Sequence, residues 1–316
     1  MKHYSIAVLL PCFNEETTIA CVVRHFREIM PEATIFVYDN NSTDRTIIEA
    51  EQAGAIVRKE PLQGKGNVVR RMFADIEADV YVLSDGDKTY DVASAPKMVS
   101  TLIRNKLDMV AASRVSTETT AYRPAHQFGN RFLSGLVAWL FGDRFKDILT
   151  GYRVFSRRFV KSFPALSRGF EIETELTVHA LELRMPSEEI DTPYHPRPAG
   201  SESKLSTWRD GARIFLTILL LLKDVRPMFF FTTISAVLAT VSLLLAWPLL
   251  TTYIETGLVP RFPTAILSTG LMSIAFLNLI CGTILDSVTR GRRELKRMSY
   301  LNIPSLECRR GEDREE

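Results

Sequence analysis

Two long uncharged stretches near the C-terminus constrain the fold of this chain more than any other feature. The first, Met228 to Leu250, continues for about 23 residues, which at ~1.5 Å rise per residue is enough to cross a ~30 Å hydrocarbon layer. The second, Thr264 to Leu285, has a similar length and follows after the short loop Thr251 to Pro263. Two such runs in tandem are unusual in soluble folds, where a buried core hairpin is the alternative. We therefore predict a transmembrane helical hairpin.

Basic residues flank the predicted hairpin, whereas its loop carries Arg261 alone. Lys223 and Arg226 precede the hairpin, and the basic residues that follow it are Arg290, Arg292, Arg293, Lys296 and Arg297. Because loops rich in Lys and Arg stay on the cytoplasmic side, both termini are expected there. The apolar run Ile6 to Leu10 ends at Pro11 and is too short for a signal peptide, which agrees with a cytoplasmic N-terminal region.

The break in charge divides the chain into four predicted regions. They are a cytosolic catalytic domain (1–205), an amphipathic juxtamembrane helix (206–226), the two transmembrane helices (227–287) and a basic cytosolic tail (288–316). Within the second region, Ile214 to Leu222 is apolar but too short to cross, so we expect a helix in the membrane interface; a plain core helix is the alternative. The net charge of +2 decides little, and no nucleic-acid partner is expected. The cysteines have no paired short spacing, so we interpret them as free thiols.

The region before the hairpin alternates between strand and helix patterns. The expected strands are 6–10, 34–38, 55–58 and 80–84, and the expected helices are 17–30, 44–53 and 66–76. This alternation predicts an α/β fold with a Rossmann-like, doubly wound and mostly parallel sheet. Ligands of such sheets bind at the carboxyl ends of the strands, so the residues that follow each strand are the candidates for function.

Polar segments follow the first two predicted strands. Pro11 to Glu16 leads into a helix with acidic first residues, which alone indicates only a helix start. In the segment 39–46, Asp39 is suited to bind a base and ribose, and Asp44 is suited to cap a helix. A simple capped turn explains the second segment equally well.

Two further segments are suited to bind phosphate and metal. Gly64-Lys65-Gly66 opens a helix, so backbone amides, a cation and the positive helix end converge on one point; a flexible turn is the alternative. In Ser84-Asp85-Gly86-Asp87, two carboxylates one residue apart at a strand end are suited to hold Mg²⁺ or Mn²⁺ against a diphosphate. Taken alone, the metal interpretation of this second segment stays open.

In their order, these segments resemble the motifs of the family 2 glycosyltransferases of the nucleotide-diphospho-sugar (GT-A) fold, in particular the dolichol-phosphate mannose synthase-like branch. The matching positions are Pro11, Phe13, Asn14 and Glu15; Asp39, Ser42, Asp44 and Thr46; Gly64, Lys65 and Gly66; and Asp85 and Asp87. The chain departs from the family pattern at Asn40 and Asn41, which stand where an aspartate and a glycine are usual. The resemblance covers almost the whole chain.

Later segments also resemble this family. Ser113-Arg114 is similar to a serine-arginine pair after a late strand, and a segment bordering the acceptor is similar at Asp147, Thr150, Gly151, Tyr152 and Arg153. Glu171 and Glu173 lie in an element that resembles the family's acidic residues near the sugar. Arg197, Gly200, Ser203 and Lys204 resemble a loop that closes over the substrate. Taken singly, the two arginines Arg153 and Arg197 fit surface charges equally well, and the two glutamates fit solvated helix positions.

The resemblance implies a hexosyltransferase that moves one sugar from a nucleotide-sugar to a polyprenyl (undecaprenyl or dolichyl) phosphate. The implied nucleotide-sugar contacts are Pro11, Phe13, Asn14, Glu15, Asp39, Asn41, Gly64, Lys65, Asp85, Gly86 and Asp87, with the metal on Asp85 and Asp87. The implied acceptor-phosphate contacts are Arg114, Arg131, Arg153, Arg197, Ser203 and Lys204. Catalysis is expected to depend on Asp85, Asp87, Arg114, Arg153 and Lys204, and Glu171 and Glu173 are sugar-site candidates.

The chemistry of the substrates fits these residue types. Metal and Lys65 would neutralise the leaving diphosphate, and the acceptor phosphate, with a second pKa near ~6, needs no strong base. Direct displacement predicts inversion at the anomeric carbon. The segment Lys88 to Asp91 differs from that of the mannose synthases, and we favour a UDP-sugar slightly over a GDP-sugar.

Three other functions stay open. The first is a glycosyltransferase of the same fold that extends a polysaccharide or glycosylates another lipid, although the Gln-x-x-Arg-Trp motif of many processive synthases is missing from the sequence. The second is an inactive membrane-bound scaffold, which the departures at Asn40 and Asn41 suggest. A nucleotidyltransferase is a weaker third option, and assembly as a homo-oligomer is left open.

Overall fold

The computed structural model describes residues 4–306 apart from 117–134, 136–144, 170, 197–218 and 221. The chain separates into two compact units. The sheet unit comprises Met1–Gly211 and Lys296–Glu316, and the hairpin unit comprises Ala212–Leu295. Each unit is described by itself.

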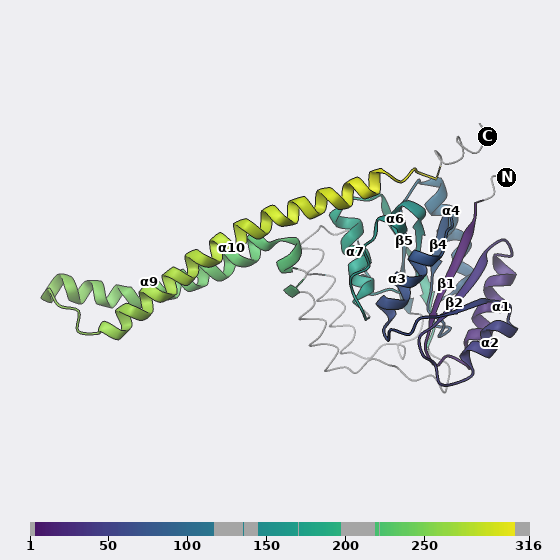
Figure 1. Cartoon of the computed structure of the whole chain (residues 1–316), viewed down its shortest axis with the longest axis horizontal. Coiled ribbons are helices and arrows are strands. Elements are labelled where there is room, and N and C mark those ends of the chain that lie inside the picture. Colours follow the sequence, from purple (N-terminus) through teal and green to yellow (C-terminus); the bar gives the residue numbers. More distant parts are fainter. Residues whose placement is uncertain are drawn as a thin grey trace. The chain divides into compact units, whose positions relative to one another are not determined.

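The sheet unit is built on one seven-stranded sheet in the order β3-β2-β1-β4-β6-β5-β7 (Figure 1). The strands are β1 (Ile6–Cys12), β2 (Thr34–Asp39), β3 (Ile56–Lys59), β4 (Val80–Leu83), β5 (Met109–Ser116), β6 (Arg153–Ser156) and β7 (Ser187–Tyr194). Among the described strands, β6 alone runs antiparallel to its two neighbours, and the other pairings are parallel. The predicted doubly wound, mostly parallel sheet is therefore confirmed.

Helices connect the parallel strands, as crossover connections require. They are α1 (Ile19–Ile29), α2 (Thr46–Gln52), α3 (Lys65–Asp75), the 3₁₀ turn η1 (Val92–Ser94), α4 (Ala95–Arg104), α6 (Arg157–Ser162) and α7 (Ile172–Glu182). The first strands and helices fall on the predicted segments, with ends that differ by one or two residues.

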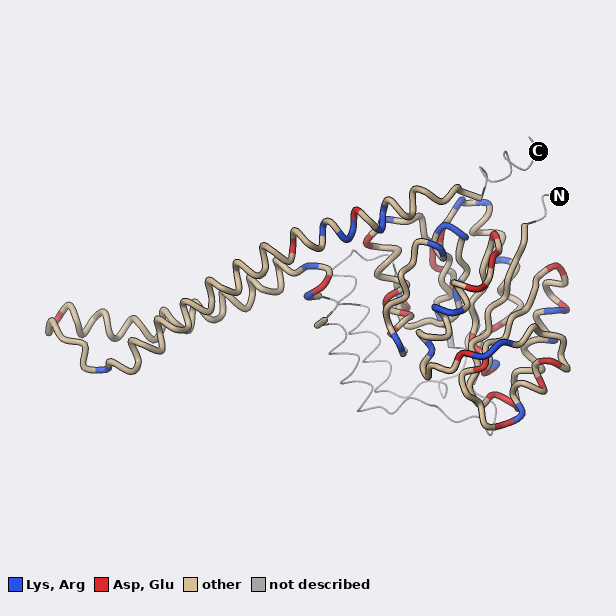
Figure 2. Tube along the Cα trace, viewed as in Figure 1, with Lys and Arg blue, Asp and Glu red and all other residues tan. Residues whose placement is uncertain are grey.

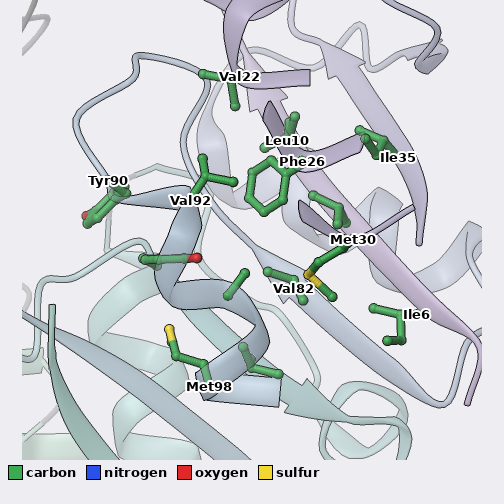
Figure 3. Packing of buried hydrophobic residues seen from close by; sticks show 14 of the residues in the cluster. Ile6, Leu10, Val22, Phe26, Met30, Ile35, Val82, Tyr90, Val92 and Met98 are labelled. Carbon is green, nitrogen blue, oxygen red and sulfur yellow. The ribbon is translucent and has the colours of Figure 1, made fainter. Parts of the chain in front are cut away.

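The core of the sheet unit forms where helix faces meet the sheet (Figure 3). Helix α1 buries Ile19, Val22, Val23 and Phe26, the spacing of a single helical face. Every residue of β4 is buried, which is the pattern of a strand covered on both faces. This core fixes the positions of the loops at the ends of the strands.

The order of the strands determines at which edge of the sheet a ligand is expected to bind. Strands β2 and β4 lie on opposite sides of β1, so the strand order reverses between β1 and β4, and ligands of such sheets bind at the carboxyl ends of the strands at this point. Because β6 is antiparallel, it begins at this same edge. Residues just before Arg153 can therefore meet the loops that follow β1, β2 and β4.

The hairpin unit contains α9 (Pro227–Thr256) and most of α10 (Phe262–Leu301). Both helices are long and apolar enough to cross a membrane, and Figure 2 shows few charges along α9 and the first half of α10. The helices contact through hydroxyls: Ser242 Oγ donates to Ser268 O at 2.8 Å, and Ser268 Oγ donates to Ser242 O at 3.0 Å. Such contacts satisfy polar groups between apolar helices.

The structure differs from expectation after the second apolar stretch. Helix α10 does not end near Leu285 but continues to Leu301, so much of the predicted tail is helical. The predicted interfacial helix at 214–222 lies outside the described residues except for 219, 220 and 222. Three described cysteines, Cys12, Cys21 and Cys281, are free thiols, as predicted.

Candidate active site

The polar segments after β1 and β2 form one hydrogen-bonded surface at the carboxyl edge of the sheet. The backbone N–H of Asn14 donates to Ser42 Oγ at 2.9 Å, and Thr43 N–H donates to Asn14 Oδ1 at 2.8 Å. The backbone N–H of Glu15 donates to Thr46 Oγ1 at 2.8 Å. The segments after β1 and β2 therefore stabilise each other's conformation.

Asn41 explains one departure from the family pattern. Its φ is 67°, in the left-handed region that glycine adopts freely and asparagine tolerates best among the other residues. Asparagine is thus a workable substitute for the usual glycine. The predicted contact of Asn41 with the nucleotide-sugar stays a prediction.

Asn40 explains the other departure. Its Nδ2 donates to Glu60 O and Leu62 O, both at 2.8 Å, and its Oδ1 accepts from Gly64 N–H at 2.7 Å. An aspartate carries no donor for the two carbonyls. Asn40 therefore holds the loop that leads into Lys65, a role that sequence reasoning missed.

Asp39 carries an unused acceptor. The residue is 2 % exposed, and its Oδ2 accepts from Ser42 N–H at 3.2 Å. Its other oxygen, Oδ1, is buried and has no hydrogen-bond partner among the residues that the structure describes. A buried acceptor without a partner is unfavourable, so Asp39 suits a ligand that brings an N–H or O–H donor.

Lys65 joins two carboxylates from distant parts of the chain. Its Nζ lies 2.5 Å from Asp85 Oδ1 and 2.7 Å from Glu173 Oε1. Burial alone would lower the pKa of Lys65, but the two carboxylates raise it above its ordinary value. Lys65 therefore stays charged, and Glu173, at the start of α7, pairs with it.

Asp85 and Asp87 suit a divalent ion that is shared with a substrate. Asp87 is 3 % exposed, and its Oδ1 accepts from the N–H and Oγ1 of Thr89 at 3.1 and 2.6 Å. No group of three or more His, Cys, Asp or Glu side chains in the described part of the chain could hold a metal by itself. Mg²⁺ is commonly bound by one or two carboxylates together with substrate phosphates, so this donor pair fits.

Gly151 lies directly against this cluster. A Cβ added to it would lie 2.8 Å from Lys65 Nζ and 2.9 Å from Asp85 Oδ2. The backbone N–H of Gly151 donates to the hydroxyl of Tyr90 at 2.8 Å. The turn before β6 is therefore one wall of the site.

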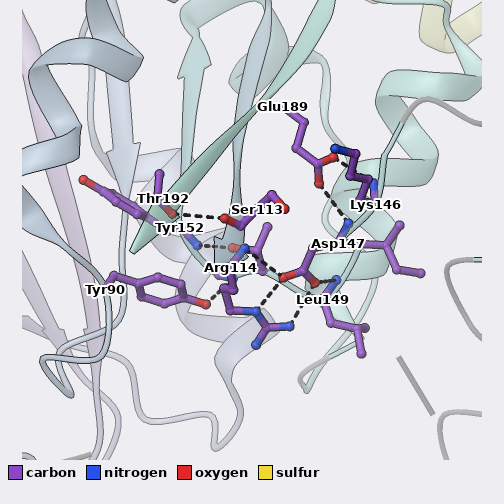
Figure 4. Close-up of polar contacts among 12 residues, drawn as sticks. Tyr90, Ser113, Arg114, Lys146, Asp147, Leu149, Tyr152, Glu189 and Thr192 are labelled. Carbon is purple, nitrogen blue, oxygen red and sulfur yellow. Dashed lines mark hydrogen bonds and ion pairs between the residues drawn. The ribbon is translucent and has the colours of Figure 1, made fainter. Parts of the chain in front are cut away.

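Arg114 is held in place at the end of β5 (Figure 4). Its Nε and Nη2 donate to the two carboxylate oxygens of Asp147 at 2.6 and 2.9 Å, which is a bidentate pair. Glu189 in turn accepts from the backbone N–H groups of Lys146 and Asp147, both at 2.8 Å. Burial raises the pKa of Glu189. Glu189 thus positions Asp147, which orients Arg114.

The structure corrects the prediction for Arg153. The side chain is fully buried, and its guanidinium donates to the carbonyls of Thr150, Ile148 and Glu173 at 2.9 to 3.0 Å. Burial lowers its pKa to about 10. An arginine enclosed by backbone carbonyls does not reach an acceptor phosphate. Arg153 instead ties the turn before β6 to the start of α7.

The remaining predicted residues divide into two groups. Pro11 lies near the end of β1, whereas Phe13, Gly64 and Gly86 lie in loops at the edge. Glu171 precedes α7, and its Oε2 is buried without a partner among the described residues. Arg131, Arg197, Ser203 and Lys204 lie outside the described residues. Sequence reasoning also missed Tyr90, although it follows Asp87 by only three positions.

Comparisons with known proteins identify the family of this chain. The model of glycosyl transferase family 2 matches residues 7–163. The chain is 34% identical over 232 residues to the glycosyltransferase AglJ of Haloferax volcanii, covering 73% of this chain and 76% of that protein. It is 27% identical over 209 residues to the dolichyl-phosphate hexose transferase of the same organism, covering 66% of this chain and 90% of that protein.

The fold is also that of a solved enzyme. Glucosyl-3-phosphoglycerate synthase from Mycobacterium tuberculosis, in complex with Mn²⁺, UDP and glucosyl-3-phosphoglycerate, superposes with a TM-score of 0.58 at 23% identity. The match covers 70% of this chain and 79% of that chain. With its sheet, its edge carboxylates and these relatives, the chain belongs to glycosyl transferase family 2 and is a glycosyltransferase.

Proposed function

We propose that this glycosyltransferase transfers a single sugar, with inversion and with a divalent metal, from a nucleotide-diphospho-sugar to a polyprenyl phosphate. The observation that carries the proposal is the convergence of Lys65, Asp85 and Asp87 at the carboxyl edge of the sheet, in a chain with two helices long enough to cross a membrane. The relative named dolichyl-phosphate hexose transferase supports this acceptor class. The product would supply later glycan or glycoprotein assembly.

The donor is proposed to bind across the loops after β1, β2 and β4. Asp39 offers its unpaired oxygen to a donor group of the base or ribose. A UDP-sugar is slightly favoured over a GDP-sugar, and the complex of the solved relative with UDP agrees with that preference.

The leaving group is proposed to lie against Lys65. Mg²⁺ or Mn²⁺ held by Asp85 and Asp87 would add positive charge at the diphosphate as the glycosidic bond breaks. Lys65 keeps its own positive charge because two carboxylates stabilise it, and Glu173 fixes the direction of its ammonium group. Removing either aspartate is therefore expected to remove most turnover.

The acceptor needs placement more than activation. A phosphate monoester has a second pKa near ~6, so its attacking oxygen is already ionised at neutral pH. Arg114, oriented by Asp147, is the described cation that suits this role, and Arg131, Arg197, Ser203 and Lys204 stay predicted contacts. Attack opposite to the leaving diphosphate would invert the anomeric carbon.

The lipid tail explains the apolar helices. A polyprenyl chain stays in the bilayer, so its phosphate must meet the enzyme at the membrane surface. We place both termini and the sheet unit on the cytoplasmic side, since basic residues are concentrated on both flanks of the hairpin, whereas its loop carries Arg261 alone.

The decisive experiment measures transfer of radiolabel from a panel of UDP- and GDP-sugars to undecaprenyl or dolichyl phosphate by the detergent-purified full chain. Asp87→Asn is expected to abolish a metal-dependent, organic-extractable product. Asp191→Asn, which changes an exposed aspartate of β7, is expected to retain it. The anomeric coupling of the product tests inversion.

Other outcomes of this experiment would favour one of the alternative functions. Label that appears only in a polysaccharide or another lipid would favour a different acceptor for the same fold. A purified chain that binds no nucleotide-sugar with either metal would favour an inactive scaffold.

A further inference from the structure

Tyr90 is a rigidly held residue beside the carboxylate cluster. It is 6 % exposed, and its ring lies 5.4 Å from the ring of Tyr152 and 5.5 Å from that of Tyr194, centroid to centroid. An isolated backbone bridge also pairs Tyr90 with Tyr194 at the end of β7. The direction of its hydroxyl is thus set by packing (Figure 4).

The hydroxyl of Tyr90 has a proton to donate. Its oxygen already accepts the N–H of Gly151 at 2.8 Å, and no described residue accepts the hydroxyl proton. A buried donor without an acceptor is unfavourable, which makes this proton available to a ligand. Burial raises the pKa of Tyr90, so the phenol remains protonated at neutral pH.

Gly151 connects this hydroxyl to the metal-binding edge. The N–H of Gly151 faces Tyr90, and the position of its missing Cβ is within 3 Å of Lys65 Nζ and Asp85 Oδ2. Tyr90, Lys65 and Asp85 therefore surround the same backbone residue. The three side chains offer one hydroxyl donor, one cation and one metal ligand, which together suit a diphosphate.

We propose that the Tyr90 hydroxyl donates a hydrogen bond to an oxygen of the donor's diphosphate, which makes Tyr90 a substrate-contacting residue. The inference rests on the proposed nucleotide-sugar donor but not on the identity of the acceptor. Tyr90 transfers no proton: the bond between the anomeric carbon and the diphosphate oxygen breaks, its electron pair leaves with the diphosphate, and the hydrogen bond strengthens as that charge grows.

A pair of matched variants tests the role of the hydroxyl. Tyr90→Phe keeps the ring and removes the proton. Tyr152→Phe makes the same change on the neighbouring ring, where the hydroxyl is buried and has no partner among the described residues. A hydrogen bond to a charged oxygen implies that Tyr90→Phe lowers kcat/KM for the donor by roughly 10- to 100-fold, and Tyr152→Phe by less than about 2-fold.

Nucleotide binding separates a direct contact from a structural effect. With Mg²⁺ or Mn²⁺ present, Tyr90→Phe is expected to weaken binding of UDP at least about 5-fold and to leave UMP unchanged, because only UDP carries the second phosphate. GDP and GMP replace them if the wild type prefers guanine. Equal weakening of both nucleotides, or wild-type kcat/KM in Tyr90→Phe, would overturn the inference.

The binding assay also keeps this inference apart from the proposed function. If the wild type transfers nothing to polyprenyl phosphate but Tyr90→Phe still loses affinity for the diphosphate alone, the acceptor is wrong and the role of Tyr90 stands. If transfer occurs and Tyr90→Phe behaves as Tyr152→Phe does, the proposed function stands and the role of Tyr90 falls.

Discussion

The side-chain amide of Asn40 stabilises the loop before Lys65 through the hydrogen bonds that it donates. One side chain satisfies two backbone carbonyls and one backbone N–H of the loop before Lys65. Asn40→Asp replaces both donors by acceptors, so the carboxylate would face Glu60 O and Leu62 O without a proton between them.

We expect Asn40→Asp to reduce the free energy of unfolding by about 1–3 kcal/mol and to weaken nucleotide-sugar binding, because the loop before Lys65 loses its brace. Thermal unfolding and donor KM measure the two effects. Asn302→Asp makes the same change at an exposed position and serves as the control. An Asn40→Asp variant with wild-type melting temperature and KM would contradict the assigned role.

The structure leaves no room for a side chain at Gly151. The Cβ of Gly151→Ala would press on Lys65 Nζ and Asp85 Oδ2, so the lysine and the carboxylate would have to move apart. Activity should fall at least about 10-fold, since small displacements of catalytic groups lower rates strongly. The matched control is Gly291→Ala, where nothing lies within 4 Å of the added Cβ. Equal kcat/KM for the two variants would show that the site has room.

Most residues that match family motifs lie together in the candidate site, but Arg153 does not contact the substrate side of it. The motif positions Lys65, Asp85 and Glu173 form one ion cluster, although they are far apart in the sequence. Arg153 also matched a motif, yet it is buried among carbonyls. A motif identifies a residue type at a position, but its burial depends on which elements pack around it.

At the scale of elements, the end of α10 forms part of the sheet unit. Lys296 Nζ lies 2.9 Å from Glu182 Oε2, and the Tyr300 hydroxyl donates to Asp108 Oδ2 at 2.7 Å. The guanidinium of Arg158 lies 4.3 Å above the ring of Tyr300 and also pairs with Asp108. Asp108 is 2 % exposed, so these contacts anchor the segment on a buried charge.

Tyr300→Phe is expected to lower the free energy of unfolding of the sheet unit by about 1–2 kcal/mol, because a buried carboxylate loses one donor. Thermal unfolding of the full chain measures the change. Tyr253→Phe alters a half-exposed tyrosine of α9 and should leave the melting temperature unchanged. If both variants melt as the wild type does, the contact with Asp108 adds nothing to stability.

The type of each element was readable from the sequence where periodicity was strong. The four strands and three helices up to Leu83 and the two apolar helices were predicted in place. The antiparallel β6 and the extension of α10 were not, since neither pairing direction nor helix ends leave a clear local pattern. The loop around Lys88, with φ of 60°, likewise gave no signal in advance.

At the scale of the whole molecule, His179 makes stability depend on pH. It is 2 % exposed and packs against the rings of Phe159 and Phe163. Burial, and secondarily the charge of Lys296, lowers its pKa to about 3. The unfolded chain therefore takes up a proton near pH ~6.5, whereas the folded chain does not.

Neutral His179 therefore stabilises the fold fully above pH ~6.5, and its contribution to the free energy of unfolding is lost as pH falls toward about 3, at roughly 1.4 kcal/mol per pH unit. Unfolding free energies of wild type and His179→Leu between pH 7 and 4 measure it. The variant is expected to lose less stability on acidification, whereas His195→Gln, at an exposed position, should follow the wild type. Parallel curves for all three proteins would contradict a neutral buried His179.

The sequence by itself determined the class of this protein: hydrophobic periodicity implied the parallel sheet, long charge-free runs implied membrane-length helices, and motif order implied a glycosyltransferase. Tertiary structure alone decided which polar residues meet. Lys65 and Glu173 are separated by more than a hundred positions and become neighbours because α3 and α7 both begin at one edge of the sheet. The physical reason is that periodicity is a local property, whereas a site depends on strand order and on burial, which the whole chain sets together.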